Sequence, residues 1–194
     1  FRKGGMGAMH QWYDPIDTTN PRLIKLAKAL GSCWVRVSGT WATKTYYDFE
    51  GTGVTPEGYQ NRLTKEQWIN LLSFVKAVDG KLKISVANCD GLHSAEEPWN
   101  PSQAEKIFAL SKEYGVSAEA VEFVNEPNLK EHTGFPKGYT AAHYRRDADL
   151  FHKWVRKNYP ECLLVGPSDT DPEAMKGNPF DQETAGGTGI AEAL

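Results

Sequence analysis

The sequence predicts an α/β fold with a parallel sheet that forms about five units of a (β/α)8 TIM barrel. Strand-length apolar runs alternate with helical patterns about five times along the 194 residues, as in successive βαβ units. Polar residues directly follow several of these runs, as they do at the catalytic end of a barrel. The chain lacks the Gly-rich turn and the Gly-x-x-x-x-Gly-Lys-Ser/Thr motif that would favour an open nucleotide-binding sheet. We expect one domain, residues 1–194.

The predicted strands are short apolar or alternating runs. They cover residues 4–10, 33–38, 82–86, 121–124 and 163–165. The fourth run contains Val121, Phe123 and Val124 and reads as a buried parallel strand. It stops before Pro127, which has no N–H to donate to a sheet.

The helix starts are marked by residues that can accept hydrogen bonds from the first backbone N–H groups. These residues are Asn20, Thr64, Asn100 and Thr140. Pro21 and Pro101 suit the first helical position, and Gln67 and Gln103 complete capping boxes. Residues 39–63 are expected to form a long polar and aromatic loop, and loops of that length are usually functional or mobile.

The composition argues against several partners. A net charge of −3 without a Lys/Arg run gives no reason to expect binding to nucleic acid or to an anionic membrane. No apolar stretch is long enough to span a bilayer, and the chain does not begin like a signal peptide. We expect Cys33, Cys89 and Cys162 to be free thiols, and the five histidines lack metal-ligand spacing. No metal or other cofactor is therefore expected.

Glu126 is the candidate catalytic residue. It follows a buried strand at the point where the backbone must turn away, and α/β enzymes keep catalytic groups at that edge of the sheet. The alternative is an ordinary glutamate in a surface loop. The preceding Asn125 is a candidate ligand of a substrate hydroxyl, with capping of the strand end as its alternative.

The order of the motifs resembles the retaining glycosidases of the (β/α)8 clan, and more closely the heparanase-like β-glucuronidases of glycoside hydrolase family 79. The matching segments are Arg36-Val37-Ser38-Gly39-Thr40, residues 82–88, Pro98-Trp99-Asn100, Val124-Asn125-Glu126-Pro127-Asn128 and Val165-Gly166-Pro167-Ser168-Asp169. The resemblance implies a retaining glycoside hydrolase that cleaves β-glucuronide linkages in oligo- or polysaccharides. It makes Glu126 the general acid/base, while Asn125 binds the 2-hydroxyl of the scissile sugar.

The chain departs from this family in three ways. Ser38-Gly39 stands where the family commonly has paired glycines, and the segment 41–63 also differs. A complete barrel needs about 250 residues, and the family nucleophile, strands six to eight and the β-sandwich domain have no counterpart here. We therefore expect this chain alone to be inactive and either unstable or oligomeric, with the missing part of the barrel as its partner. The resemblance also implies a secreted, extracellular protein.

Five further residues are candidates for substrate binding: Asn88, Asp90, His10, Thr40 and Trp99. An Asx turn explains Asn88 and Asp90 about as well, and Thr40 also suits a structural role. The Trp99 ring could stack on a sugar or cover the core. Other candidates are the loop aromatics, three lysines that could meet a uronate and a carboxylate after the fifth strand. They are Trp12, Trp41, Tyr46, Tyr47, Lys44, Lys130, Lys137 and Asp169.

Two other functions stay open at this point. The protein could act on neutral β-glycosides such as xylosides, or it could be a barrel that binds glycans without catalysis. The sequence does not separate exo from endo cleavage. The remaining histidines, His93, His132, His143 and His152, are interpreted as surface or loop residues.

Overall fold

The computed structural model describes residues 7–10 and 17–166. In chain order its elements are β1 (Gly7–His10), α1 (Pro21–Ala29), β2 (Trp34–Val37), the 3-10 helix η1 (Ala42–Lys44), β3 (Thr45–Asp48), β4 (Asn61–Thr64), α2 (Lys65–Ala77), β5 (Lys81–Ser85), α3 (Ser102–Glu113), β6 (Ala118–Glu122), α4 (Lys130–Thr133), α5 (Ala141–Asn158) and β7 (Leu163–Val165).

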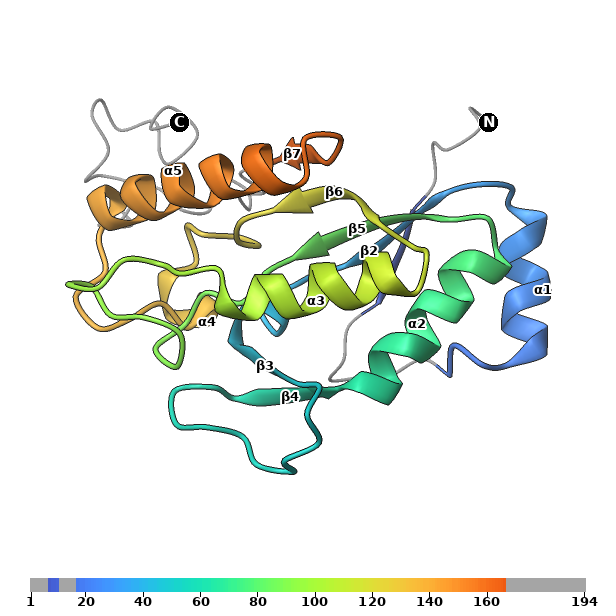
Figure 1. Cartoon of the computed structure of the whole chain (residues 1–194), viewed down its shortest axis with the longest axis horizontal. Helices are drawn as coiled ribbons and strands as arrows, with labels where there is room; N and C mark the ends of the chain where they lie inside the picture. Colours follow the sequence, from blue (N-terminus) through green and yellow to red (C-terminus); the bar gives the residue numbers. More distant parts are fainter. Residues whose placement is uncertain (1–6, 11–16, 167–194) are drawn as a thin grey trace.

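The main sheet has five strands in the order β1-β2-β5-β6-β7, and all its neighbours are parallel. Each strand lies beside the one that precedes it in this sheet, so the winding does not reverse within the described residues. A doubly wound sheet would contain such a reversal. The α/β class and the parallel sheet are thus confirmed, whereas closure into a barrel stays a prediction. Figure 1 shows α3 in front of this sheet and α5 along β6 and β7.

The two faces of the main sheet differ in chemistry because side chains alternate along each strand. Val35 pairs with Leu82 and Ile84 with Val121, and all four are buried. This apolar face joins the helices in one core with Trp68, Leu72, Phe108 and Phe151. The other face carries polar side chains that are described with the site.

Three of the four predicted helix starts form as expected. Asn20 Oδ1 accepts from Arg22 N at 2.9 Å. Thr64 with Gln67, and Thr140 with His143, make capping boxes at α2 and α5. Each cap satisfies N–H groups that have no partner inside the helix.

The capping box predicted for α3 is wrong. Pro101 is the N-cap residue and makes no side-chain cap, while Asn100 Oδ1 accepts from Ser102 N at 3.1 Å. Gln103 Oε1 instead accepts from Tyr47 N at 2.9 Å. Its side chain is therefore committed to tertiary structure, because a buried backbone N–H of β3 needs an acceptor.

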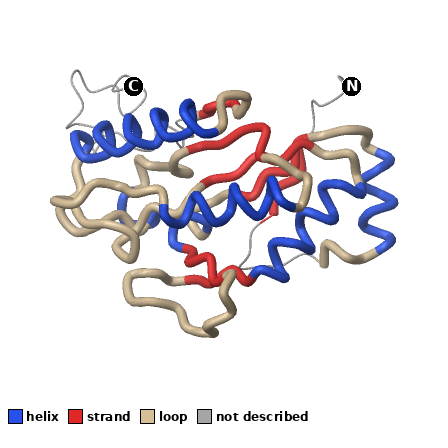
Figure 2. The backbone as a smooth tube through the Cα atoms, in the orientation of Figure 1, coloured by secondary structure: helices blue, strands red, loops and turns tan. Residues whose placement is uncertain are grey.

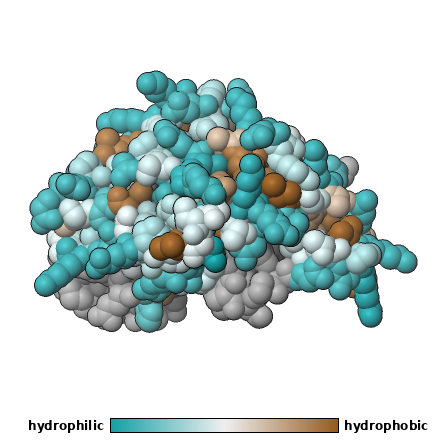
Figure 3. Space-filling model, turned by 60° about the horizontal axis from the view of Figure 1, so that its bottom comes forward, coloured by the Kyte–Doolittle hydropathy of each residue, from teal (hydrophilic) through white to brown (hydrophobic). Residues whose placement is uncertain are grey.

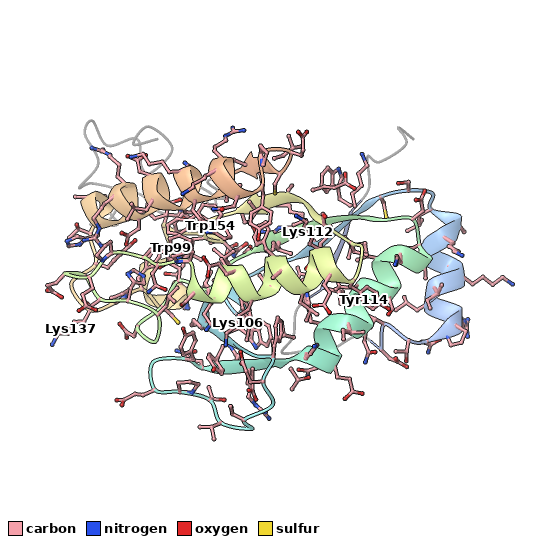
Figure 4. All side chains as sticks on the ribbon, viewed as in Figure 1. Trp99, Lys106, Lys112, Tyr114, Lys137 and Trp154 are labelled. Atoms are coloured by element: carbon pink, nitrogen blue, oxygen red, sulfur yellow. The ribbon has the colours of Figure 1, made fainter. Side chains whose placement is uncertain are left out.

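The segment 39–63 is more ordered than the predicted loop. It contains η1, β3 and β4, and β3 pairs with β4 in parallel as a separate two-stranded sheet (Figure 2). Lys106 of α3 (labelled in Figure 4) contacts this segment. The Lys106 Nζ lies 3.0 Å from Glu50 Oε2 and 5.1 Å from the centre of the Tyr46 ring. Strands β3 and β4 have only four residues each and lie within the segment predicted as a loop.

Asp48 closes the turn that follows β3. Burial raises the pKa of Asp48, but hydrogen bonds from Thr52 N, Gly53 N and the Arg62 side chain outweigh it and hold that pKa well below its usual range. The carboxylate therefore stays ionised and fixes the turn.

None of the helices that the structure describes is both long and apolar enough to cross a bilayer. On the face drawn in Figure 3, apolar residues stand apart among hydrophilic ones. Cys33, Cys89 and Cys162 are buried free thiols, as predicted.

Candidate active site

The carboxyl ends of β2, β5 and β6 meet at one edge of the main sheet because the strands are parallel. Asn125 and Glu126 follow β6 at this edge, and Ser38 follows β2. Strand β6 ends at Glu122, earlier than the predicted end at Val124, although Phe123 and Val124 remain buried. The sequence therefore placed Glu126 correctly just beyond the strand.

Glu126 has a left-handed backbone. Its φ is +50°, and among the described residues only Asp79 shares a positive φ without being glycine. The carbonyl oxygen of Glu126 accepts from Leu129 N at 2.9 Å and closes the turn. A non-glycine residue in this conformation costs of order 1–3 kcal/mol, and such strain clusters at functional sites. Glu126 is partly exposed between buried neighbours, so its carboxyl can meet a ligand.

Asn125 is 5% exposed and is held from the β2 side. Its Oδ1 accepts from Arg36 Nη2 at 2.6 Å and lies 3.3 Å from Ser38 Oγ. The bond from Arg36 fixes the orientation of the amide, because Nδ2 could not accept it. The Nδ2 group, on the other arm of the amide, is then the donor that a substrate oxygen would meet.

A buried carboxylate beneath Asn125 was missed by the sequence analysis. Glu122 is fully buried, with Arg36 Nη2 at 2.8 Å from Oε1 and Lys83 Nζ at 3.1 Å from Oε2. Ser38 and Ser85 also hydrogen-bond to Oε1. The signal was present, because Arg36, Lys83 and Glu122 each lie between two apolar residues of a strand. Residues 121–124 were interpreted as an apolar run, which concealed it.

Asn88 is fully buried after β5 and braces the edge of the sheet. Its Oδ1 hydrogen-bonds to His93 Nε2, and its backbone N donates to Thr43 O at 2.8 Å. Thr43 Oγ1 in turn donates to Thr133 O at 2.7 Å. The segments that follow β2, β5 and β6 are therefore tied together.

His93 lies in the loop after β5, which agrees with its interpretation as a surface or loop residue, and its side chain is buried. Its Nδ1 lies 3.6 Å from Asp147 Oδ2. Asp147 also accepts from the Tyr139 hydroxyl at 2.9 Å and from Arg146 Nε at 2.7 Å. Burial lowers the pKa of His93, while Asp147 opposes that shift. This polar cluster holds the loop after β5 against α5.

Acidification should destabilise the fold through His93. Because its pKa is lower in the folded chain, the unfolded chain takes up the proton first as pH falls below about 6.5, and stability present above that pH is lost. Urea unfolding on both sides of this pH should show a smaller acid loss in His93→Gln than in the wild type. His132→Gln, at an exposed site, is the control. An equal acid loss in wild type and His93→Gln would contradict this prediction.

The other predicted site residues fall in different places. Thr40 is half-buried and its carbonyl accepts from Thr43 Oγ1 at 2.8 Å. Asp90 is exposed in the loop after β5. His10 ends β1 opposite Val37, and its side chain lies outside the described residues. Asp169 and Trp12 also lie outside them.

Trp99 lies in the core and does not form a platform at the rim. It is 4% exposed, and its Nε1 donates to Ala87 O at 3.2 Å. Its ring meets Phe123 and Phe151 edge to face, with centroids 5.8 and 5.4 Å apart, and Trp154 at 6.0 Å (Figure 4). Aromatic partners thus occupy the surroundings where a sugar would have to stack. Trp99 covers the core, which is the second of its two predicted roles.

The described residues contain no group of three or more His, Cys, Asp or Glu side chains placed to hold a metal ion. A hollow at the opposite end of the strands is lined by residues from the turns before β5 and β6, including Asp79, Gly80 and Gly115. It shares no residue with the candidate site.

The comparisons with known proteins give one distant relative. No family model matches the sequence. A hyaluronoglucuronidase from Hirudo nipponia is 29% identical over 183 residues, and the match covers 78% of this chain and 36% of the relative. The chain thus spans about a third of the relative's length.

Two solved structures are similar at a low level. N2152 from Neocallimastix frontalis has a TM-score of 0.47 at 17% identity, covering 91% of this chain and 40% of that one. A conserved exported protein from Bacteroides fragilis has a TM-score of 0.49 at 12% identity, covering 91% and 47%.

Proposed function

We propose that this chain carries the acid/base part of the active site of a retaining glycoside hydrolase that cleaves β-glucuronide linkages in glycans. The observation that carries the proposal is the placement of Glu126. It stands in a left-handed turn at the carboxyl edge of a parallel sheet, directly after an asparagine whose amide is fixed. The relative named hyaluronoglucuronidase supports the same class of reaction.

The chemistry needs two carboxyl groups about 5–5.5 Å apart. In the first step Glu126 gives its proton to the leaving oxygen while the second carboxylate attacks the anomeric carbon and forms a glycosyl ester. In the second step Glu126 takes a proton from water, whose oxygen attacks the same carbon and releases the second carboxylate. We assign the nucleophile to a residue outside this chain, because the nearby Glu122 is enclosed and paired with Arg36 and Lys83.

Asn125 is assigned to the 2-hydroxyl of the sugar that is cleaved. Its Oδ1 accepts from Arg36, so Nδ2 is the group that donates to the hydroxyl oxygen. Hydrogen bonds at this position strengthen in the transition state and therefore raise kcat more than they lower KM. Glucuronide-containing glycans are extracellular polymers, so we also place the protein outside the cell.

The test is hydrolysis by the full-length gene product that contains this chain. We expect it to cleave an aryl β-glucuronide faster than an aryl β-xyloside and to release the β-anomer first, as NMR of the fresh product would show. Faster cleavage of the xyloside would assign the protein to neutral glycosides. If the protein bound a glucuronide-containing glycan but hydrolysed neither substrate, the result would favour the alternative of a glycan-binding barrel without catalytic activity.

A further inference from the structure

We propose that Glu122 is a positioning residue, which holds Arg36 against the amide of Asn125 and thereby aims that amide at the substrate. This inference rests on the proposed function. It concerns a residue of β6 that lies four positions before Glu126 and does not itself touch the substrate. The effect passes through one guanidinium group.

The contact chain is short and direct. Arg36 Nη2 lies 2.8 Å from Glu122 Oε1 and 2.6 Å from Asn125 Oδ1. One nitrogen of the guanidinium therefore serves both acceptors, and the position of the carboxylate sets where that nitrogen sits. Arg36 comes from β2 and the two acceptors come from β6 and its end, with β5 between the strands.

Lys83 and the serines fix the carboxylate itself. Lys83 Nζ holds Oε2 at 3.1 Å, while Ser38 and Ser85 bond to Oε1 together with Arg36. The two oxygens of Glu122 are thus held from different sides, so the carboxylate cannot turn without losing a partner. Ser38 Oγ also lies 3.3 Å from Asn125 Oδ1, so the same hydroxyl packs against both acceptors of Arg36.

The charge balance indicates a role beyond packing. The Glu122 side chain is fully buried, whereas those of Arg36 and Lys83 are 23% and 21% exposed. Removing a carboxylate from water is expensive, and apolar residues of similar volume often stabilise a buried site as well or better. Arg36 reaches solvent, so loss of Glu122 would remove the buried carboxylate that holds its guanidinium beside Asn125. A buried carboxylate at this point is explained if its task is to keep the guanidinium in place.

The experiment compares the wild type and Glu122→Gln, as full-length proteins, on a substrate with the 2-hydroxyl and on one without it. With an aryl β-glucuronide, we expect Glu122→Gln to lower kcat about tenfold to hundredfold, with a smaller change in KM. With the 2-deoxy analogue the wild type already lacks the Asn125 contact, so the same substitution should lower kcat far less. A merely structural role would lower both rates by the same factor.

Arg36→Lys is the second variant, because lysine keeps a positive charge near Glu122 but its ammonium does not reproduce the position of Nη2, which bonds both acceptors. The loss of kcat in Arg36→Lys should depend on the 2-hydroxyl in the same way. If thermal unfolding shows that Glu122→Gln is not folded, Arg36→Lys provides the test. Equal losses on both substrates would overturn the positioning role and leave the proposed function standing. A wild-type protein that hydrolyses neither substrate would instead overturn the proposed function.

Discussion

Replacing Glu126 with glutamine should lower kcat for a glucuronide with a poor leaving group about 10²–10⁴-fold, while the protein stays folded. Glutamine keeps the shape of the side chain but has no proton of suitable acidity to give. The loss should shrink for an aryl substrate whose leaving oxygen needs no proton. Steady-state rates on two aryl glucuronides of different leaving-group pKa would measure this difference.

Azide provides an independent check of the same assignment. In Glu126→Gln the glycosyl ester would persist because no base activates water, whereas azide is a nucleophile that needs no base. Added azide should therefore restore turnover and give a β-glycosyl azide. Glu119→Gln, on the same strand but exposed and distant from the site edge, is the matched control and should behave as wild type. If Glu126→Gln without azide turned over as fast as the wild type, Glu126 would not be the acid/base residue.

Trp99→Ala should destabilise the fold by about 3–5 kcal/mol, the range for loss of a buried large aromatic side chain. The substitution would leave a cavity among Phe123, Phe151 and Trp154 and an unpaired carbonyl at Ala87. Denaturant unfolding would measure the change. Lys112→Ala, at an exposed position of α3, should stay within about 0.5 kcal/mol of wild type.

Trp99→Phe separates the two interpretations of this residue. It keeps a ring in the core and should retain affinity for glycan with a smaller loss of stability than Trp99→Ala. If Trp99 were a sugar platform at the surface, alanine would weaken glycan binding without a large change in unfolding free energy. That pattern would contradict the core placement.

The sequence predicted the scaffold well where local chemistry decides the structure. Asn20, Thr64 and Thr140 start helices because their side chains satisfy backbone groups within one turn. The apolar run at Val121 identified a buried strand, although β6 ends at Glu122 and not at the predicted Val124. Such signals need no knowledge of what lies far away in the chain.

The sequence failed where the partner of a side chain is distant. The position of Gln103 suited a capping box. Its side-chain oxygen instead accepts a hydrogen bond from the backbone N–H of Tyr47, 56 positions away in the sequence. The ion pair of Glu122 with Arg36, 86 positions earlier, became recognisable only from the strand order. His93 similarly needs Asp147 of α5 to explain its burial. The roles of these residues can be assigned only after it is known which strands and helices lie beside one another.

Because of the left-handed turn at Glu126, thermal stability and the proposed catalytic activity favour different residues at this position. A residue of L chirality gives up roughly 1–2 kcal/mol in that backbone region, whereas glycine adopts it freely. Selection of variants for thermal stability alone would therefore favour glycine at position 126, where we propose the proton donor. Variants that outlast their parent should be sequenced at codon 126 before any fall in turnover is attributed to the rest of the molecule.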